Sequence, residues 1–176
     1  MPLFSAEFTA GSRPWITTLV VSSIAFSTIF ACATPFAALA VIAAVTLGRR
    51  DAIFCVLAAW LANQFIGYAF LGYPQTAGSF AWGGVMAVAA LASVFASIGA
   101  LSRIVGEWKR VAAAFVASVL SYQAVMLLAS LTPLGGLGDF TVSIVGYVIG
   151  VNAMAMAGLL ALRYAFAATF ARKISA

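Results

Sequence analysis

Long apolar runs separated by short polar breaks dominate the pattern of this chain. Between charged residues, proline and glycine, six runs are predicted to be helices, at residues 15–33, 35–48, 52–72, 80–102, 111–132 and 141–166. A membrane-spanning helix needs about 20 apolar residues, and every run except 35–48 reaches or approaches that length. Because the run 35–48 is shorter, we expect it to form a tilted or partial span. The pattern predicts an all-α polytopic membrane protein with six transmembrane helices in a single domain, residues 1–176.

Composition supports this prediction and limits the possible partners. The chain is 65% hydrophobic and only 7% charged, which is far below the charge of ordinary soluble domains. A net charge of +5 is compatible with nucleic-acid binding. However, the basic residues occur singly and in pairs and form no basic stripe. We therefore interpret them as topology signals in contact with membrane lipid, and we expect no nucleic acid partner.

The basic residues also predict the orientation of the chain. In a six-span arrangement all nine fall on one side: Arg13, Arg49, Arg50, Arg103, Lys109, Arg110, Arg163, Arg172 and Lys173. The positive-inside rule makes that side the cytoplasm, so both termini are expected there. Arg163 lies near the end of the sixth run, where its long side chain is expected to reach the lipid headgroups. In an alternative interpretation, residues 1–33 are a signal peptide cleaved after Ala31-Cys32-Ala33, but we expect the uncleaved form.

The middle of each run contains no Asp, Glu, Lys or His, and the chain has no histidine at all. Ion-coupled carriers usually keep an ionisable residue at membrane depth, and hydrolases need a general base or a set of metal ligands. A catalytic enzyme is therefore not expected. The polar residues at depth are uncharged and suit either hydrogen bonds between helices or a neutral ligand. They are Asn63, Gln64, Tyr122, Gln123 and Asn152.

Small residues recur every four positions in three of the predicted helices. These ridges are Ser23, Ser27 and Ala31 in the first helix, Ala40 and Ala44 in the second, and Ala89 and Ser93 in the fourth. Small residues let helices approach closely in lipid. We expect most of the ridges to pack inside the bundle, although one of them could dock on another membrane protein.

The three connections on the side opposite the basic residues are rich in aromatic residues, proline, glycine, glutamine and threonine. An aromatic belt at the membrane surface explains some of these residues. The contrast with the charged connections on the other side favours a pocket for a flat organic molecule. The candidate binding residues are Tyr68, Tyr73, Gln75, Trp82, Asp139 and Tyr147.

The two cysteines are predicted to lie near opposite faces of the membrane. At 1.5 Å per residue, Cys32 and Cys55 differ in depth by roughly 20 Å, so they cannot form a disulfide with each other. We interpret Cys55 as a small buried hydrophobic residue. Cys32 lies beside Pro35 in the first of the three uncharged connections. It is either a packing residue or a soft ligand for a metal centre carried by the substrate.

The chain resembles the substrate-binding S-components of energy-coupling factor vitamin transporters. Two stretches carry the likeness, "CATPFAALA" at 32–40 and "WLANQFIGYAFLGYP" at 60–74, followed by Trp82. Within that group the chain is most similar to the BtuM-like cobalamin S-components of Proteobacteria. The resemblance implies a multi-pass protein of the bacterial inner membrane that takes up a vitamin, most directly cobalamin. It also implies a transmembrane partner subunit with ATPases, and this chain itself has no G-x-x-x-x-G-K-[ST] phosphate-binding loop.

The resemblance also implies a role for Cys32. A cysteine near the outer face ligates the corrin cobalt in the similar proteins and is associated with removal of cyanide from cyanocobalamin, so Cys32 is the candidate for this role. Cobalamin would then be a bound substrate, and no cofactor of the protein's own is expected. Two alternatives stay open: an S-component for a different vitamin, and a structural subunit of a larger membrane complex. The first helix carries Ser23, Ser27 and Ala31 in place of the Ala-x-x-x-Ala docking ridge typical of S-components.

Overall fold

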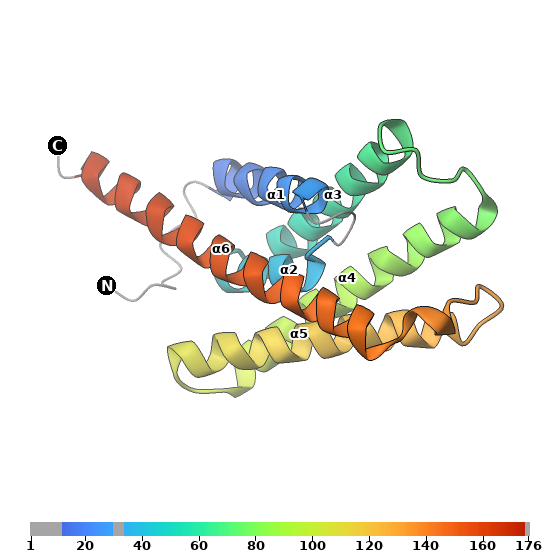
Figure 1. Ribbon diagram of the computed structural model, residues 1–176. Coiled ribbons are helices and arrows are strands. Elements are labelled where there is room, and N and C mark those ends of the chain that lie inside the picture. The colour runs from blue at the N-terminus through green and yellow to red at the C-terminus, as the bar shows by residue number, and fades with distance from the viewer. Residues whose placement is uncertain (1–11, 30–33, 175–176) are drawn as a thin grey trace.

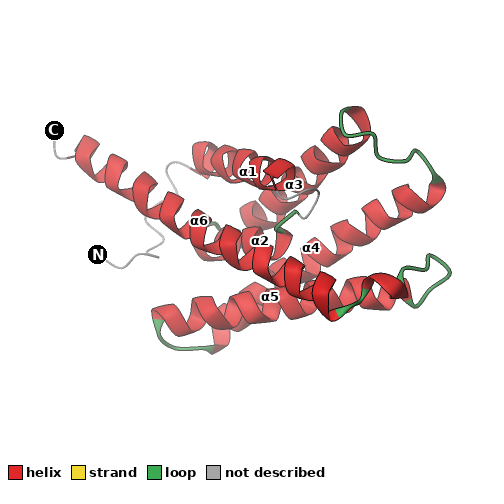
Figure 2. Ribbon diagram, in the orientation of Figure 1, coloured by secondary structure: helices red, strands yellow, loops and turns green. Residues whose placement is uncertain are grey.

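The computed structural model of the protein describes residues 12–29 and 34–174, and this part of the chain is entirely helical apart from its connections (Figures 1 and 2). All six predicted helices are present, in the predicted order and within a few residues of the predicted bounds, apart from a longer sixth helix. They are α1 (Ser12–Ile29), α2 (Phe36–Thr46), α3 (Arg49–Ala69), α4 (Ala77–Arg103), α5 (Glu107–Ser130) and α6 (Val142–Ile174), with one 3-10 turn, η2 (Leu137–Asp139).

The connections between helices gather at two opposite ends of the bundle (Figure 1). One end holds the connections before α3 and before α5, with Arg49, Arg50, Arg103 and Lys109 around them, and we refer to it as the charged end. The other holds the connections 70–76 and 131–141, and we refer to it as the aromatic end. Successive long helices therefore run in alternating directions between the two ends.

Helix α2 is the centre of the bundle and packs against every other helix. Its residues Phe36–Ala43 are all buried, because the helix is apolar on every side and has no polar face to turn outward. Its 11 residues extend for only about 16 Å, roughly half the thickness of a bilayer's hydrocarbon layer. The predicted second span is therefore a short buried helix. Helices α3, α4 and α5 and residues 142–165 of α6 are long and apolar enough to cross a membrane.

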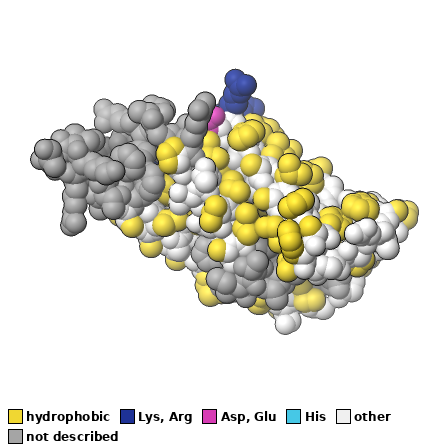
Figure 3. All heavy atoms as spheres, turned by 90° about the horizontal axis from the view of Figure 1, so that it is seen from above, with side chains coloured by type: hydrophobic (Ala, Val, Ile, Leu, Met, Phe, Trp, Pro, Cys, Tyr) yellow, Lys and Arg dark blue, Asp and Glu magenta, His cyan; other side chains and the backbone are white. Residues whose placement is uncertain are grey.

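Apolar side chains are spread over the described part of the face shown in Figure 3. On α3, for example, Phe54, Leu61 and Phe65 are more than 60% exposed and follow each other at helical spacing. A soluble monomer rarely exposes such continuous apolar surface, whereas a lipid-facing helix requires it. The fold therefore supports membrane insertion independently of composition.

At the charged end, Trp15 connects three helices. Its Nε1 donates a hydrogen bond to Thr46 Oγ1 at the end of α2 (2.9 Å), and its ring lies 5.7 Å from the guanidinium carbon of Arg163 on α6. Arg163 is only 5% exposed. The prediction that its side chain reaches the lipid headgroups is therefore wrong, since the guanidinium lies against the face of an aromatic ring inside the bundle.

Most described side chains of the small-residue ridges face inward, and Ala44 is partly exposed. Ser23, Ala40, Ala89 and Ser93 are all buried, which confirms the expectation of internal packing. One of the two serines also bridges helices: Ser93 Oγ on α4 donates to the carbonyl oxygen of Ser118 on α5 (3.1 Å). Ser27 and Ala31 lie outside the side chains that the structure describes.

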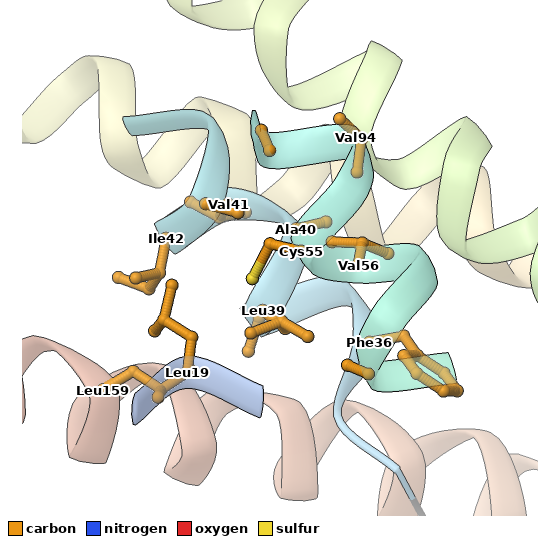
Figure 4. Packing of buried hydrophobic residues seen from close by; sticks show 14 of the residues in the cluster. Leu19, Phe36, Leu39, Ala40, Val41, Ile42, Cys55, Val56, Val94 and Leu159 are labelled. Carbon is orange, nitrogen blue, oxygen red and sulfur yellow. The ribbon is translucent and has the colours of Figure 1, made fainter. Parts of the chain in front are cut away.

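The thiol of Cys55 lies in the buried core, in the same cluster as Leu39, Ala40 and Val56 (Figure 4). It is a free cysteine with no exposed surface. The prediction that Cys55 packs as a small hydrophobic residue is confirmed.

Candidate binding site in the aromatic half

The buried apolar core extends through only part of the bundle. We define the aromatic half as residues 60–69, 77–88, 120–130 and 142–150, which are the parts of α3 to α6 nearest the aromatic end. Among the described residues of this half no apolar side chain is fully buried, and the buried residues are two amides, one serine and two glycines. They are Asn63, Gln64, Ser130, Gly67 and Gly83. The aromatic half therefore lacks the packed apolar interior that α2 provides elsewhere.

Helix α2 begins deep inside the bundle because three polar contacts hold its start. Thr34 Oγ1, just before α2, donates to Asn63 Oδ1 (2.9 Å), and Asn63 lies six residues before the end of α3, or about 9 Å along its axis. Asn152 Oδ1 accepts from the backbone N–H of Ala38 (3.1 Å). Ser118 Oγ donates to the carbonyl of Ala37 (2.9 Å). Thr34, where the described chain resumes before α2, therefore lies deeper in the bundle than the connections at the aromatic end.

Three aromatic residues and a serine from α3, α4 and the connection between them form a group that we call the tyrosine cluster: Tyr68, Tyr73, Ser79 and Phe80. The Tyr68 ring stacks on Phe80 with centroids 4.6 Å apart and meets Tyr73 edge-on at 5.7 Å. The Tyr68 hydroxyl and Ser79 Oγ share a hydrogen bond of 2.9 Å. Thr76 caps the start of α4 by accepting from the N–H of Ser79, which fixes the serine beside the tyrosine.

Two glycines allow α3 to fit closely against its neighbours. The Tyr73 ring lies directly against Gly67, so that any side chain at position 67 would overlap it. A methyl group at position 83 would come within 2.7 Å of Gln64 Oε1. The carbonyl of Gly83 also accepts from Trp60 Nε1 (2.9 Å). The contacts at Gly67 and Gly83 both lie in the aromatic half, and both depend on the absence of a side chain at the glycine.

The polar residues predicted at depth have three kinds of environment. Asn63 and Asn152 form hydrogen bonds between segments, as expected of interhelical contacts. Tyr122 stacks on Phe36 of α2 with centroids 6.4 Å apart. The Nε2 atoms of Gln64 and Gln123 are buried, yet neither has a hydrogen-bond partner in the part of the chain that the structure describes. A buried amide nitrogen without an acceptor is unfavourable by about 1–3 kcal/mol.

The structure brings together only some of the predicted binding residues. Tyr68 and Tyr73 are in contact, and Gln75 is exposed on the connection 70–76. Trp82 is half-buried on α4, and Tyr147 is 51% exposed on α6. The side chain of Asp139 and the whole of Cys32 lie outside the described residues, so their predicted roles stay predictions.

The predicted binding residues did not include three residues that the structure places in or beside the tyrosine cluster. Phe80 and Ser79 contact Tyr68, and Trp60 binds the Gly83 carbonyl one turn of α4 away. The spacing of Ser79 and Phe80 beyond Tyr68 could have indicated their proximity, because α3 and α4 are joined by a short connection. Trp60 lay within the stretch 60–74 but had no signal that distinguished it from a lipid-facing residue.

The chemistry available in this half is aromatic stacking and neutral hydrogen bonding. No group of three His, Cys, Asp or Glu side chains converges among the described residues. Comparisons with protein-family models, curated proteins and solved structures find no match to this chain. A functional proposal for this chain therefore rests on the residues of the aromatic half and their contacts.

Proposed function

We propose that this chain is the substrate-binding component of a vitamin transporter in a bacterial inner membrane, and that its substrate is a cobalamin. One observation carries the proposal: the apolar core stops midway, and the aromatic half contains only polar and glycine residues among its buried described positions. A bundle with a half of this kind can accept a large planar guest between its helices. The tyrosine cluster supplies stacking surface beside that half.

The proposed topology has six helices with both termini in the cytoplasm, and α2 is a partial span buried inside the bundle. The aromatic end then faces the periplasm, where a vitamin arrives, and the charged end faces the cytoplasm, as the positive-inside rule requires. The basic side chains at the connections before α3 and α5 support this orientation. ATP hydrolysis would be supplied by partner subunits, since the sequence has no phosphate-binding loop.

Cys32 is proposed as the ligand of the corrin cobalt. It stands two residues before Thr34, whose hydroxyl is fixed to Asn63 at the floor of the aromatic half. A thiolate donates an electron pair strongly to Co(III) and weakens the bond to the ligand on the opposite face of the metal. With cyanocobalamin that ligand is cyanide, which would leave with its own electron pair. Cys55 cannot serve this role because it is fully buried in the core.

A visible spectrum of purified protein tests the proposal. Protein purified in detergent after growth with cyanocobalamin is expected to carry a corrin band in stoichiometric amount. The Cys32→Ala variant is expected to shift or lose that band, while the Cys55→Ala variant keeps it, since Cys55 lies in the core. A wild-type protein that carries no corrin band and binds thiamin, biotin or riboflavin instead would support an S-component for a different vitamin.

The second alternative, a structural subunit of a larger complex, has less support. It relied on small-residue ridges as docking faces, but Ser23, Ala40, Ala89 and Ser93 are buried inside the bundle. Co-purification with a fixed set of large membrane partners, together with no small ligand, would nevertheless favour it over substrate capture.

A further inference from the structure

Gln64 on α3 and Gln123 on α5 share an unusual state. Gln64 is 92% buried, with only 8% of its surface exposed, and its Nε2 has no acceptor within the described part of the chain. The Nε2 of Gln123 is likewise buried without an acceptor there. Folding has removed both nitrogens from water without supplying a replacement partner, which is unfavourable for each of them.

Both glutamines lie in the aromatic half, and their heights can be compared along α4. Gln64 Oε1 lies close to Gly83 of α4. For Gln123 the register follows from the hydrogen bond between Ser93 and Ser118, because α4 and α5 run in opposite directions. Five residues beyond Ser118, Gln123 is level with about position 88 of α4. Positions 83 and 88 are separated by about 8 Å along the helix axis, so the two amides differ in depth by about that distance.

Other amides at comparable depth do have partners. Asn152 accepts from the Ala38 N–H and donates its own Nδ2 to the Val148 carbonyl (2.9 Å). Thr34 donates to Asn63. The bundle therefore provides partners for the amides that hold α2 in place. Within the described residues it provides no acceptor for the two glutamine donors in the aromatic half.

We infer that Gln64 and Gln123 are ligand-binding donors that bind carbonyl oxygens of the substrate. This inference rests on the proposed function and specifies the chemistry of the same site. A ligand that fits must carry at least two carbonyl oxygens on a largely apolar, planar body, because the surrounding groups are aromatic rings and uncharged amides. A corrin with peripheral carboxamides has this character, and an anion does not, since no cationic side chain lies beside either glutamine at this depth among the described residues.

The test compares stability with affinity in the full-length protein in detergent. Gln64→Met and Gln123→Met keep the length of the side chain and remove the donor. Each is expected to raise the dissociation constant for cyanocobalamin about three- to tenfold, as loss of one neutral hydrogen bond does, without lowering the thermal midpoint of the empty protein. Asn152→Leu is the comparison variant, because the Asn152 amide has hydrogen-bond partners within the protein. The thermal midpoint of this variant is expected to fall. Ser102→Ala, at the charged end, is the control for affinity, and its dissociation constant for cyanocobalamin is expected to equal that of the wild-type protein.

Each outcome bears on the inference. Unchanged affinity in both methionine variants would overturn it and leave the proposed function intact. A fall in thermal midpoint similar to that of Asn152→Leu would also overturn it, because it would mark the glutamines as structural. If the wild-type protein binds no cyanocobalamin, the proposed function fails and this inference fails with it.

Discussion

At the scale of single residues, Gly67 and Gly83 determine how closely α3 approaches the groups around it. Gly67 leaves room for the Tyr73 ring, and its carbonyl oxygen accepts a hydrogen bond from the Tyr73 N–H (3.0 Å), while Gly83 leaves room for the side-chain oxygen of Gln64. Neither glycine has a positive φ, so close contact is the reason for glycine here and unusual backbone geometry is not. The tyrosine cluster therefore depends on the absence of a methyl group at position 67.

Gly67→Ala is expected to destabilise the protein by about 1–3 kcal/mol, because Tyr73 must move and lose its edge-on contact with Tyr68. The thermal midpoint of the empty protein in detergent measures this effect. Gly84→Ala is the matched control, since no atom lies within 4 Å of a methyl group there. Alanine in that exposed helical position should stabilise by about 0.5–1 kcal/mol. Equal effects of the two substitutions would contradict the close contact at position 67.

The sequence indicated some of these residues for physical reasons and could not indicate others. Tyr68 and Tyr73 are close along the chain at a helix end, so their contact follows from local geometry. Asn152, by contrast, meets Ala38 across 114 positions, and only the folded bundle determines which amide finds a partner. That Gln64 Nε2 has no acceptor among the described residues was unpredictable for the same reason.

At the scale of elements, α2 is the feature that most distinguishes this bundle. Its length was foreseen in part, because the run 35–48 was too short for an ordinary span. Its central position was not foreseen, since a helix that is apolar on all sides has no polar face to indicate which side is outward. Lipid-facing and fully buried helices have the same composition, and only packing separates them.

Ala40→Leu in α2 is expected to destabilise the bundle by about 1–3 kcal/mol through overpacking, because Ala40 has no exposed surface and is surrounded by other helices. Ala112→Leu on the exposed side of α5 is the control and should change stability by less than about 0.5 kcal/mol. Thermal unfolding in one detergent compares the two. If Ala40→Leu is as mild as its control, α2 is not closely packed.

At the scale of the whole molecule, the distribution of charge was the most reliable signal in the sequence. Basic residues far apart along the chain, such as Arg49 and Arg103, lie at the same end of the bundle (Figure 1). Two helices, α3 and α4, separate these two residues, so the chain leaves that end and returns to it. The separation of the charged and aromatic ends follows directly from this pattern. The incomplete core of the aromatic half did not follow, since it arises from where α2 begins.

Accessibility of introduced thiols in intact cells tests the proposed orientation. In a Cys32→Ala, Cys55→Ala background, Gln75→Cys at the aromatic end is expected to react with a membrane-impermeant maleimide added from the periplasmic side. Ser102→Cys at the charged end is expected to react only after the membrane is permeabilised. Labelling in the reverse order would place the aromatic end in the cytoplasm and contradict capture of a substrate from outside.

The dependence of α2 on α6 has a consequence for biogenesis. An 11-residue helix gains too little from lipid to be stably inserted by itself, and its first turn needs the amide of Asn152, which is synthesised more than one hundred residues later. Until α6 has entered the membrane, the N–H of Ala38 has no acceptor from that helix. The centre of the bundle is therefore completed only after α6 has left the ribosome, and a chain truncated before α6 should be recognised by membrane proteases as unfinished.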